Sequence, residues 1–77
     1  MSNNAMTETP SLGLRLKQLR NALGLTQERL APLLQVTVST VNRWEANRSI
    51  PSRRAEGAIR TLAAQSDLPD PWEPVVA

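Results

Sequence analysis

Cysteine and histidine are both absent from this chain of 77 residues. Their absence excludes a disulfide, a zinc site built from Cys or His, and Cys- or His-based catalysis within the chain. Phenylalanine and tyrosine are absent too, and the hydrophobic 40% is almost all Leu, Val, Ile and Ala. This composition favours a small helical bundle over a β-sandwich.

Long apolar runs are also missing. No segment approaches the ~18 apolar residues of a transmembrane helix, and the N-terminal residues lack the apolar core of a signal peptide. We therefore expect no membrane partner and a cytoplasmic location. The length suffices for one small domain with a thin core.

Positive charge is concentrated in the middle of the chain. All nine basic residues, eight of them Arg, lie within residues 11–66, where there are only three acidic residues, so this segment carries a net charge of +6. A compact basic body suits a polyanionic partner, although an ordinary solvated surface can have the same composition. With so few acidic residues, no acid–base pair or metal cluster is evident, and we expect neither an enzyme nor a cofactor.

Three segments are predicted along the chain. Residues 1–10 are polar and predict a disordered lead, in which Met6 is a candidate native start after an expression remnant. Residues 11–66 form the predicted domain. Residues 67–77 hold three prolines and predict an extended tail. In that tail, Trp72 either packs back onto the domain, stays solvated, or anchors a protein partner.

Four helices are predicted from apolar spacing and capping residues. Ser11, Thr26, Thr37 and Ser52 are the expected N-caps, and apolar residues at helical spacing follow each of them. Gly24 is expected to end the first helix in a left-handed conformation.

The segment "VTVSTVNRWE", residues 36–45, has two interpretations. Its alternating β-branched residues favour a strand. With Thr37 as N-cap, however, Val36 and Val41 occupy the positions of a hydrophobic staple, as Leu25 and Leu30 do one helix earlier. No other β-rich segment precedes the tail, so the helix is favoured. Its outward face then consists of Val38, Ser39, Asn42 and Arg43.

Two short capped helices joined at Gln35–Val36 have the outline of a helix-turn-helix. The segment "LGLTQERLAPLLQVTVSTVNRWEANRSIPS" resembles the phage repressor/Cro-type helix-turn-helix family, also called the xenobiotic-response-element group, and its small antitoxin-like members in particular. The most specific parts are "LTQ..LA", "TV.RWE" and the "PS" that opens the last helix. The resemblance implies an all-α, compact bundle of four to five short helices, a lambda-repressor-like DNA-binding domain.

Candidate base contacts lie on the outward face of the second helix of this motif. Arg43 suits bidentate contact with guanine, and Asn42 offers an amide for adenine. Ser39 lies in the first turn, which such helices direct at bases. Val38 is suited to an apolar contact with a thymine methyl group or with the DNA backbone. The alternative is that these four residues form an ordinary solvated face.

Candidate phosphate contacts are fewer and weaker. The resemblance implies that Gln27, at the start of its helix, approaches a phosphate, and we add Thr40, Arg48 and Arg53. For Arg53, a solvated surface is equally plausible, since a cation in a first turn opposes the helix dipole.

Arg20 and Glu45 fall near the inward faces of their helices. The resemblance implies that they form a partly buried ion pair with a structural role, and Trp44 is expected in the core.

Three positions depart from the family pattern. Gln35 stands where a glycine is usual, Pro32 falls inside a helix, and Ala46–Asn47 replaces the common "NG", so Asn47 is expected in the left-handed conformation.

The favoured function is a transcriptional regulator, expected to be a repressor, that reads the major groove of double-stranded DNA with the helix Val38–Glu45 and binds a palindromic operator as a homodimer. One alternative is the antitoxin of a toxin–antitoxin pair, which also represses its operon and holds a toxin through the tail. The other is a protein-interaction module that has kept the fold but lost DNA binding.

Overall fold

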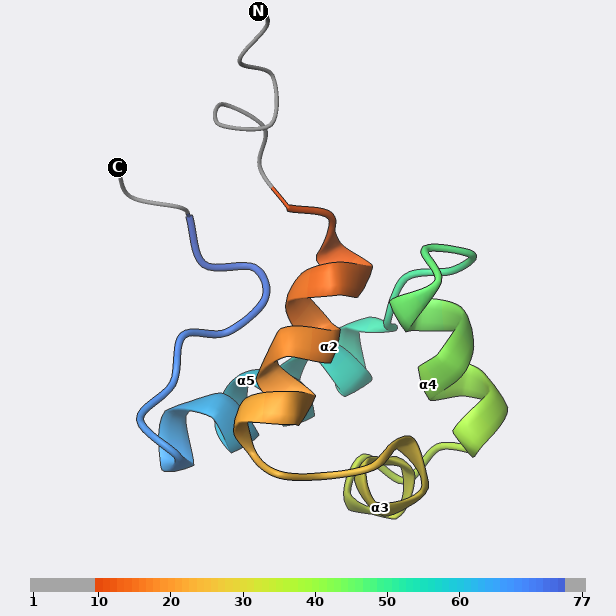
Figure 1. Cartoon of the computed structure of the whole chain (residues 1–77), viewed down its shortest axis with the longest axis horizontal. Helices are drawn as coiled ribbons and strands as arrows, with labels where there is room; N and C mark the ends of the chain where they lie inside the picture. Colours follow the sequence, from red (N-terminus) through yellow and green to blue (C-terminus); the bar gives the residue numbers. More distant parts are fainter. Residues whose placement is uncertain (1–9, 75–77) are drawn as a thin grey trace, which may run out of the picture.

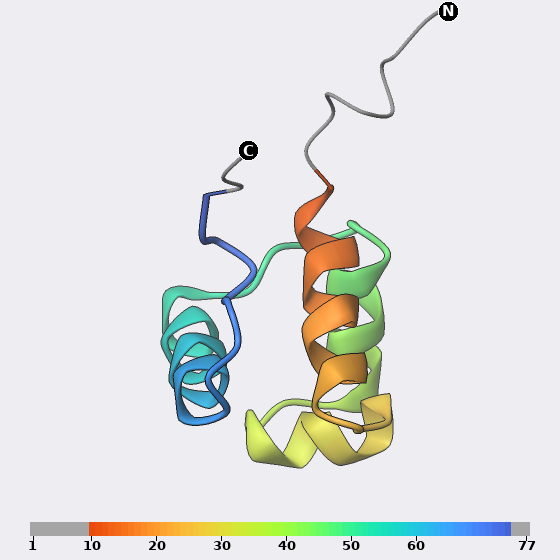
Figure 2. The same ribbon diagram turned by 60° about the vertical axis from the view of Figure 1, so that its left-hand side comes forward.

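The computed structural model describes residues 10–74, so the candidate start at Met6, the rest of the lead and residues 75–77 lie outside the described residues. Within residues 10–74 there are four helices and no strand: α2 (Leu12–Ala22), α3 (Gln27–Leu33), α4 (Val38–Glu45) and α5 (Arg53–Gln65). Helices α2 and α4 lie side by side, α3 lies across one end of this pair, and α5 faces them across the core (Figures 1 and 2). The predicted all-α bundle is confirmed.

Each helix begins after a hydroxyl residue, as predicted. The side chains of Ser11, Thr26, Thr37 and Ser52 each accept a hydrogen bond from the backbone N–H three residues further on. Such a cap typically stabilises a helix by about 1 kcal/mol, because it satisfies a backbone donor that has no partner inside the helix. The helical interpretation of the segment after Thr37 is therefore confirmed.

The core is formed by the apolar stripes of all four helices. The staple residues Leu25 and Val36, which precede the N-caps of α3 and α4, are partly buried against this core. Their packing fixes the direction in which the chain enters each helix. The buried members are aliphatic except for one tryptophan. They are Leu16, Leu19, Leu30, Ala31, Leu34, Val41, Trp44, Ala55, Ile59 and Ala63.

The turn between α3 and α4 is closed by a residue in the left-handed conformation. Gln35 has a φ of 59°, its N–H donates to the Pro32 carbonyl, and the next N–H, of Val36, donates to the Ala31 carbonyl. Gly24 and Asn47 are also left-handed, with φ of 71° and 60°, as predicted. Pro32 lies inside α3, as predicted, and the helix ends one residue later.

A close approach of α2 to the end of α4 depends on Gly13. A methyl group at Gly13 would lie 2.6 Å from the carbonyl oxygens of Trp44 and Glu45. The Gly13 N–H donates to Oδ1 of Asn47 at 3.0 Å, and Nδ2 of Asn47 donates to Ser11 Oγ at 3.0 Å. Asn47 therefore connects the end of α4 to the start of α2, a link that the sequence analysis missed.

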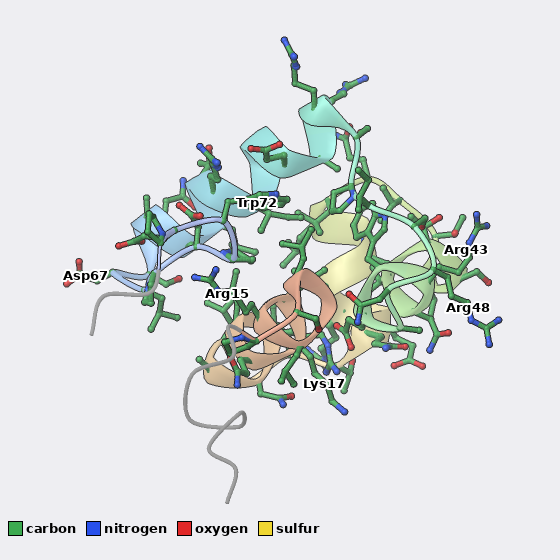
Figure 3. All side chains as sticks on the ribbon, turned by 90° about the horizontal axis from the view of Figure 1, so that it is seen from above. Arg15, Lys17, Arg43, Arg48, Asp67 and Trp72 are labelled. Atoms are coloured by element: carbon green, nitrogen blue, oxygen red, sulfur yellow. The ribbon has the colours of Figure 1, made fainter. Side chains whose placement is uncertain are left out.

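The described part of the tail lies against the domain. Leu68 and Trp72 pack against the core, and the guanidinium of Arg60 lies 5.5 Å from the centroid of the Trp72 ring. Arg15 donates to the Glu73 carbonyl, which holds the tail beside α2. Figure 3 shows Arg15 and Trp72 on the same side of the molecule.

Gly13→Ala is expected to destabilise the fold by about 2 kcal/mol, in the usual range for overpacking, because the two nearest atoms are backbone oxygens that cannot move aside. Gly57→Ala in α5 is the matched control, since a methyl group there has no neighbour within 4 Å. The control should gain up to ~1 kcal/mol from helix propensity. Urea unfolding of both variants measures the difference, and equal effects would contradict the close approach.

Gln35→Gly is expected to stabilise the protein by about 1 kcal/mol, because glycine adopts a positive φ without the steric cost that a side chain incurs. Thermal unfolding followed by circular dichroism provides the measurement. Gln18→Gly, on an exposed position of α2, should instead lower the melting temperature. A loss of stability in Gln35→Gly would show that the turn is not strained.

Candidate nucleic-acid interface

The outer face of α4 is determined by what its inner face buries. Val41 and Trp44 are buried in the core. The helical period then turns the other side outward. The four candidate base-contacting residues are accordingly exposed: Val38, Ser39, Asn42 and Arg43.

Two arginines extend the basic character of this face. Arg43 is in the last turn of α4 and Arg48 follows the helix, where its N–H donates to the Arg43 carbonyl at 2.9 Å. Figure 3 shows both side chains projecting away from the body on the same side of the molecule. Among residues 10–74, neither forms an ion pair, so their charge is available to an anion.

The remaining candidate phosphate contacts differ in how free they are. Arg53 is exposed at the start of α5. Thr40 is half-buried, and its hydroxyl lies 2.9 Å from that of Thr37. Gln27 is also half-buried at the start of α3, and its amide is engaged within the protein.

Arg20 and Glu45 form a bidentate ion pair behind α4. Arg20 Nε lies 2.7 Å from Glu45 Oε2 and one terminal nitrogen lies 3.0 Å from Oε1, while the other donates to the Leu25 carbonyl at 2.9 Å. The side chains of Arg20 and Glu45 are only 11% and 5% exposed. Gln27 Nε2 donates to the same carboxylate, at 3.0 Å from Oε1. The pair thus joins α2, the start of α3 and the end of α4.

The charge on Glu45 is stabilised by this arrangement. Burial by itself raises the pKa of a carboxyl group, but the hydrogen bonds from Arg20 and Gln27 and the charge of Arg20 outweigh it, so the pKa of Glu45 is below its usual range. The Glu45 hydrogen bonds likewise raise the pKa of Arg20, against the effect of burial. Both groups are therefore ionised in the folded protein at neutral pH.

Two interactions at this site were missed from the sequence. From its sequence position, Gln27 was predicted to contact a phosphate; in the structure, its side chain contacts Glu45 and, at 3.5 Å, Asn42. The contacts join residues 15 and 18 positions apart, and no local pattern marks such a pair.

Between residues 10 and 74, no group of acidic residues is suited to a metal ion. No helix in that part of the chain is long and apolar enough to cross a membrane.

Stability is expected to fall in acid through the Arg20–Glu45 pair. The pKa of Glu45 is lower in the folded than in the unfolded state, so its contribution is present above the unfolded pKa, about 4, and is lost as the pH falls through the folded value. Urea unfolding between pH 7 and pH 3 measures this slope, which should be shallower in Glu45→Gln.

At pH 7, Arg20→Ala should lower the free energy of unfolding by about 3–5 kcal/mol, because it leaves a buried carboxylate without its partner. A loss below about 1 kcal/mol, the range of surface pairs, would contradict a buried pair.

The chain was also compared with protein-family models. The model described as Helix-turn-helix matches residues 16–55, more than half of the chain, and this range runs from α2 through the α3–α4 motif to the first turn of α5. The match supports DNA binding by a helix-turn-helix regulator. The predicted resemblance is confirmed, and the chain belongs to the Cro/C1-type helix-turn-helix family.

Proposed function

We propose that this protein is a sequence-specific repressor of transcription that reads the major groove of double-stranded DNA with the outer face of α4. The observation that carries the proposal is the exposure of Asn42 and Arg43 on a helix whose opposite face is buried and tied to α2 by a bidentate ion pair. An α-helix fits the major groove, and polar side chains on its outer face can reach base edges.

The residues divide into two kinds of contact. Arg43 suits guanine, Asn42 suits adenine, and Ser39 and Val38 lie in the first turn, where they reach the neighbouring base pairs. Contacts to phosphates position the domain without reading sequence. We assign these to Gln27 at the start of α3, Thr40 in α4, Arg48 after α4 and Arg53 at the start of α5.

Binding as a homodimer to a palindromic operator is part of this proposal. In helix-turn-helix dimers the two recognition helices enter successive major grooves, ~34–36 Å apart, and a two-fold protein then matches a palindrome. In the antitoxin alternative, Trp72 in the tail is a candidate anchor for the toxin. Trp72 instead packs against the domain, with the guanidinium of Arg60 over its ring, which favours a repressor that acts without a partner on the tail.

Fluorescence anisotropy of a labelled duplex tests the proposal. Wild-type protein should bind a random-sequence duplex with an affinity that falls steeply between 50 and 200 mM salt, because phosphate neutralisation releases counterions. On sequences selected from a random pool, Arg43→Ala should weaken binding by about tenfold or more and relax the preference for guanine at one position.

Arg15→Ala is the matched control. It removes the same charge from α2, on the tail side of the molecule, and should leave the base preference unchanged. If the folded wild-type protein does not bind DNA, the interaction module is the better interpretation. If Arg43→Ala weakens all sequences equally, Arg43 contacts phosphate and not a base.

A further inference from the structure

A chain of hydrogen bonds leads from the buried ion pair to the outer face of α4. Glu45, which Arg20 holds in place, accepts from Nε2 of Gln27 at 3.0 Å. Oε1 of the same Gln27 side chain accepts from Nδ2 of Asn42 at 3.5 Å. Gln27 therefore lies between a carboxylate behind the helix and the amide that we assign to adenine.

The direction of this chain is dictated by the carboxylate. An ionised carboxylate only accepts hydrogen bonds, so the Gln27 atom that faces Glu45 must be the nitrogen. The pKa of Glu45 is below its usual range, which keeps the group ionised at neutral pH. The oxygen of Gln27 then faces Asn42, and Asn42 must answer with its nitrogen. One charged group thus sets the orientation of two neutral amides that would otherwise be free to turn over.

This orientation matters for base recognition. Adenine presents an acceptor, N7, beside a donor, the N6 amino group, in the major groove, and a bidentate asparagine must match them in that order. With one Nδ2–H of Asn42 given to Gln27, the second Nδ2–H and Oδ1 remain to be used. A turned amide would present its donor and acceptor in the opposite order.

We propose that Gln27 is a positioning residue for sequence recognition, which holds the side-chain amide of Asn42 in the orientation that reads adenine. This inference rests on the proposed DNA-binding function. It adds a second role to Gln27, because the other Nε2–H of Gln27 remains available to a phosphate oxygen.

The test compares Gln27→Met with wild type, in the Asn42 background and in Asn42→Ala. Methionine keeps the length of the side chain and removes both hydrogen bonds. Base preferences are measured by selection from a random duplex pool. Gln27→Met should lower the preference for adenine at the Asn42 position by about tenfold and leave the guanine preference at the Arg43 position unchanged. In the Asn42→Ala background, Gln27→Met should not change the base preferences.

A second measurement uses the free protein. Gln27→Met should speed the exchange of the Asn42 side-chain amide protons with water, as followed by nuclear magnetic resonance, because their acceptor is lost. The side-chain amide of Asn21, which is exposed on α2, is the control and should be unaffected. Urea unfolding in parallel establishes that every variant compared is folded.

Two outcomes would overturn the inference while leaving the proposed function in place. One is a uniform loss of affinity in Gln27→Met with every base preference intact, as expected of a phosphate contact alone. The other is an equal effect of Gln27→Met with and without Asn42. Failure of the folded wild-type protein to bind any duplex would instead overturn the proposed function, and the positioning role with it.

Discussion

The bidentate pair between Arg20 and Glu45 is the interaction on which the orientation of α4 depends. Helix α4 has eight residues, and an isolated helix of that length is unstable in water. Two buried side chains, Val41 and Trp44, anchor its inner face, but apolar contacts alone allow a short helix to rotate or slide. The fork of Arg20 accepts one geometry of the carboxylate, and it also binds the Leu25 carbonyl before α3. Arg20 of α2 therefore contacts both helices of the motif, α4 through Glu45 and the start of α3 through the Leu25 carbonyl.

A buried ion pair is weak evidence for net stability, since desolvation of the two charges offsets much of their attraction. Its value here is geometric. Glu45 ends the helix that carries the candidate base contacts, and its carboxylate also binds Gln27 at the start of α3. The Glu45 carboxylate therefore contributes both to the stability of the fold and to the geometry of the candidate DNA-contacting face. Protonation of Glu45 would loosen both, because the neutral acid is a poorer acceptor for Arg20 and Gln27.

The arginines that contact the tail have different surroundings from those proposed to contact DNA. Arg15 and Arg60 are engaged by the tail, through the Glu73 carbonyl and the Trp72 ring. Arg43, Arg48 and Arg53 are exposed and form no ion pair within residues 10–74. Arg43 in α4 and Arg48 directly after it therefore carry unpaired positive charge on the side of the molecule that bears the candidate base contacts. This asymmetry, more than the overall charge, is what suits the α4 side to a phosphate backbone.

The sequence by itself determined the helices and their capping, because a cap or an apolar stripe is a local pattern that a few neighbouring residues complete. Thr37 is the clearest case, since it decided helix against strand for the segment that follows. The sequence also predicted the outward residues of α4 and, through the family resemblance, the Arg20–Glu45 pair. Only the tertiary structure decided the close approach at Gly13, the hydrogen bonds that Gln27 makes to Glu45 and Asn42, and the position of Trp72 against Arg60. Each of these joins residues far apart in the chain, and their geometry exists only after the helices have packed together.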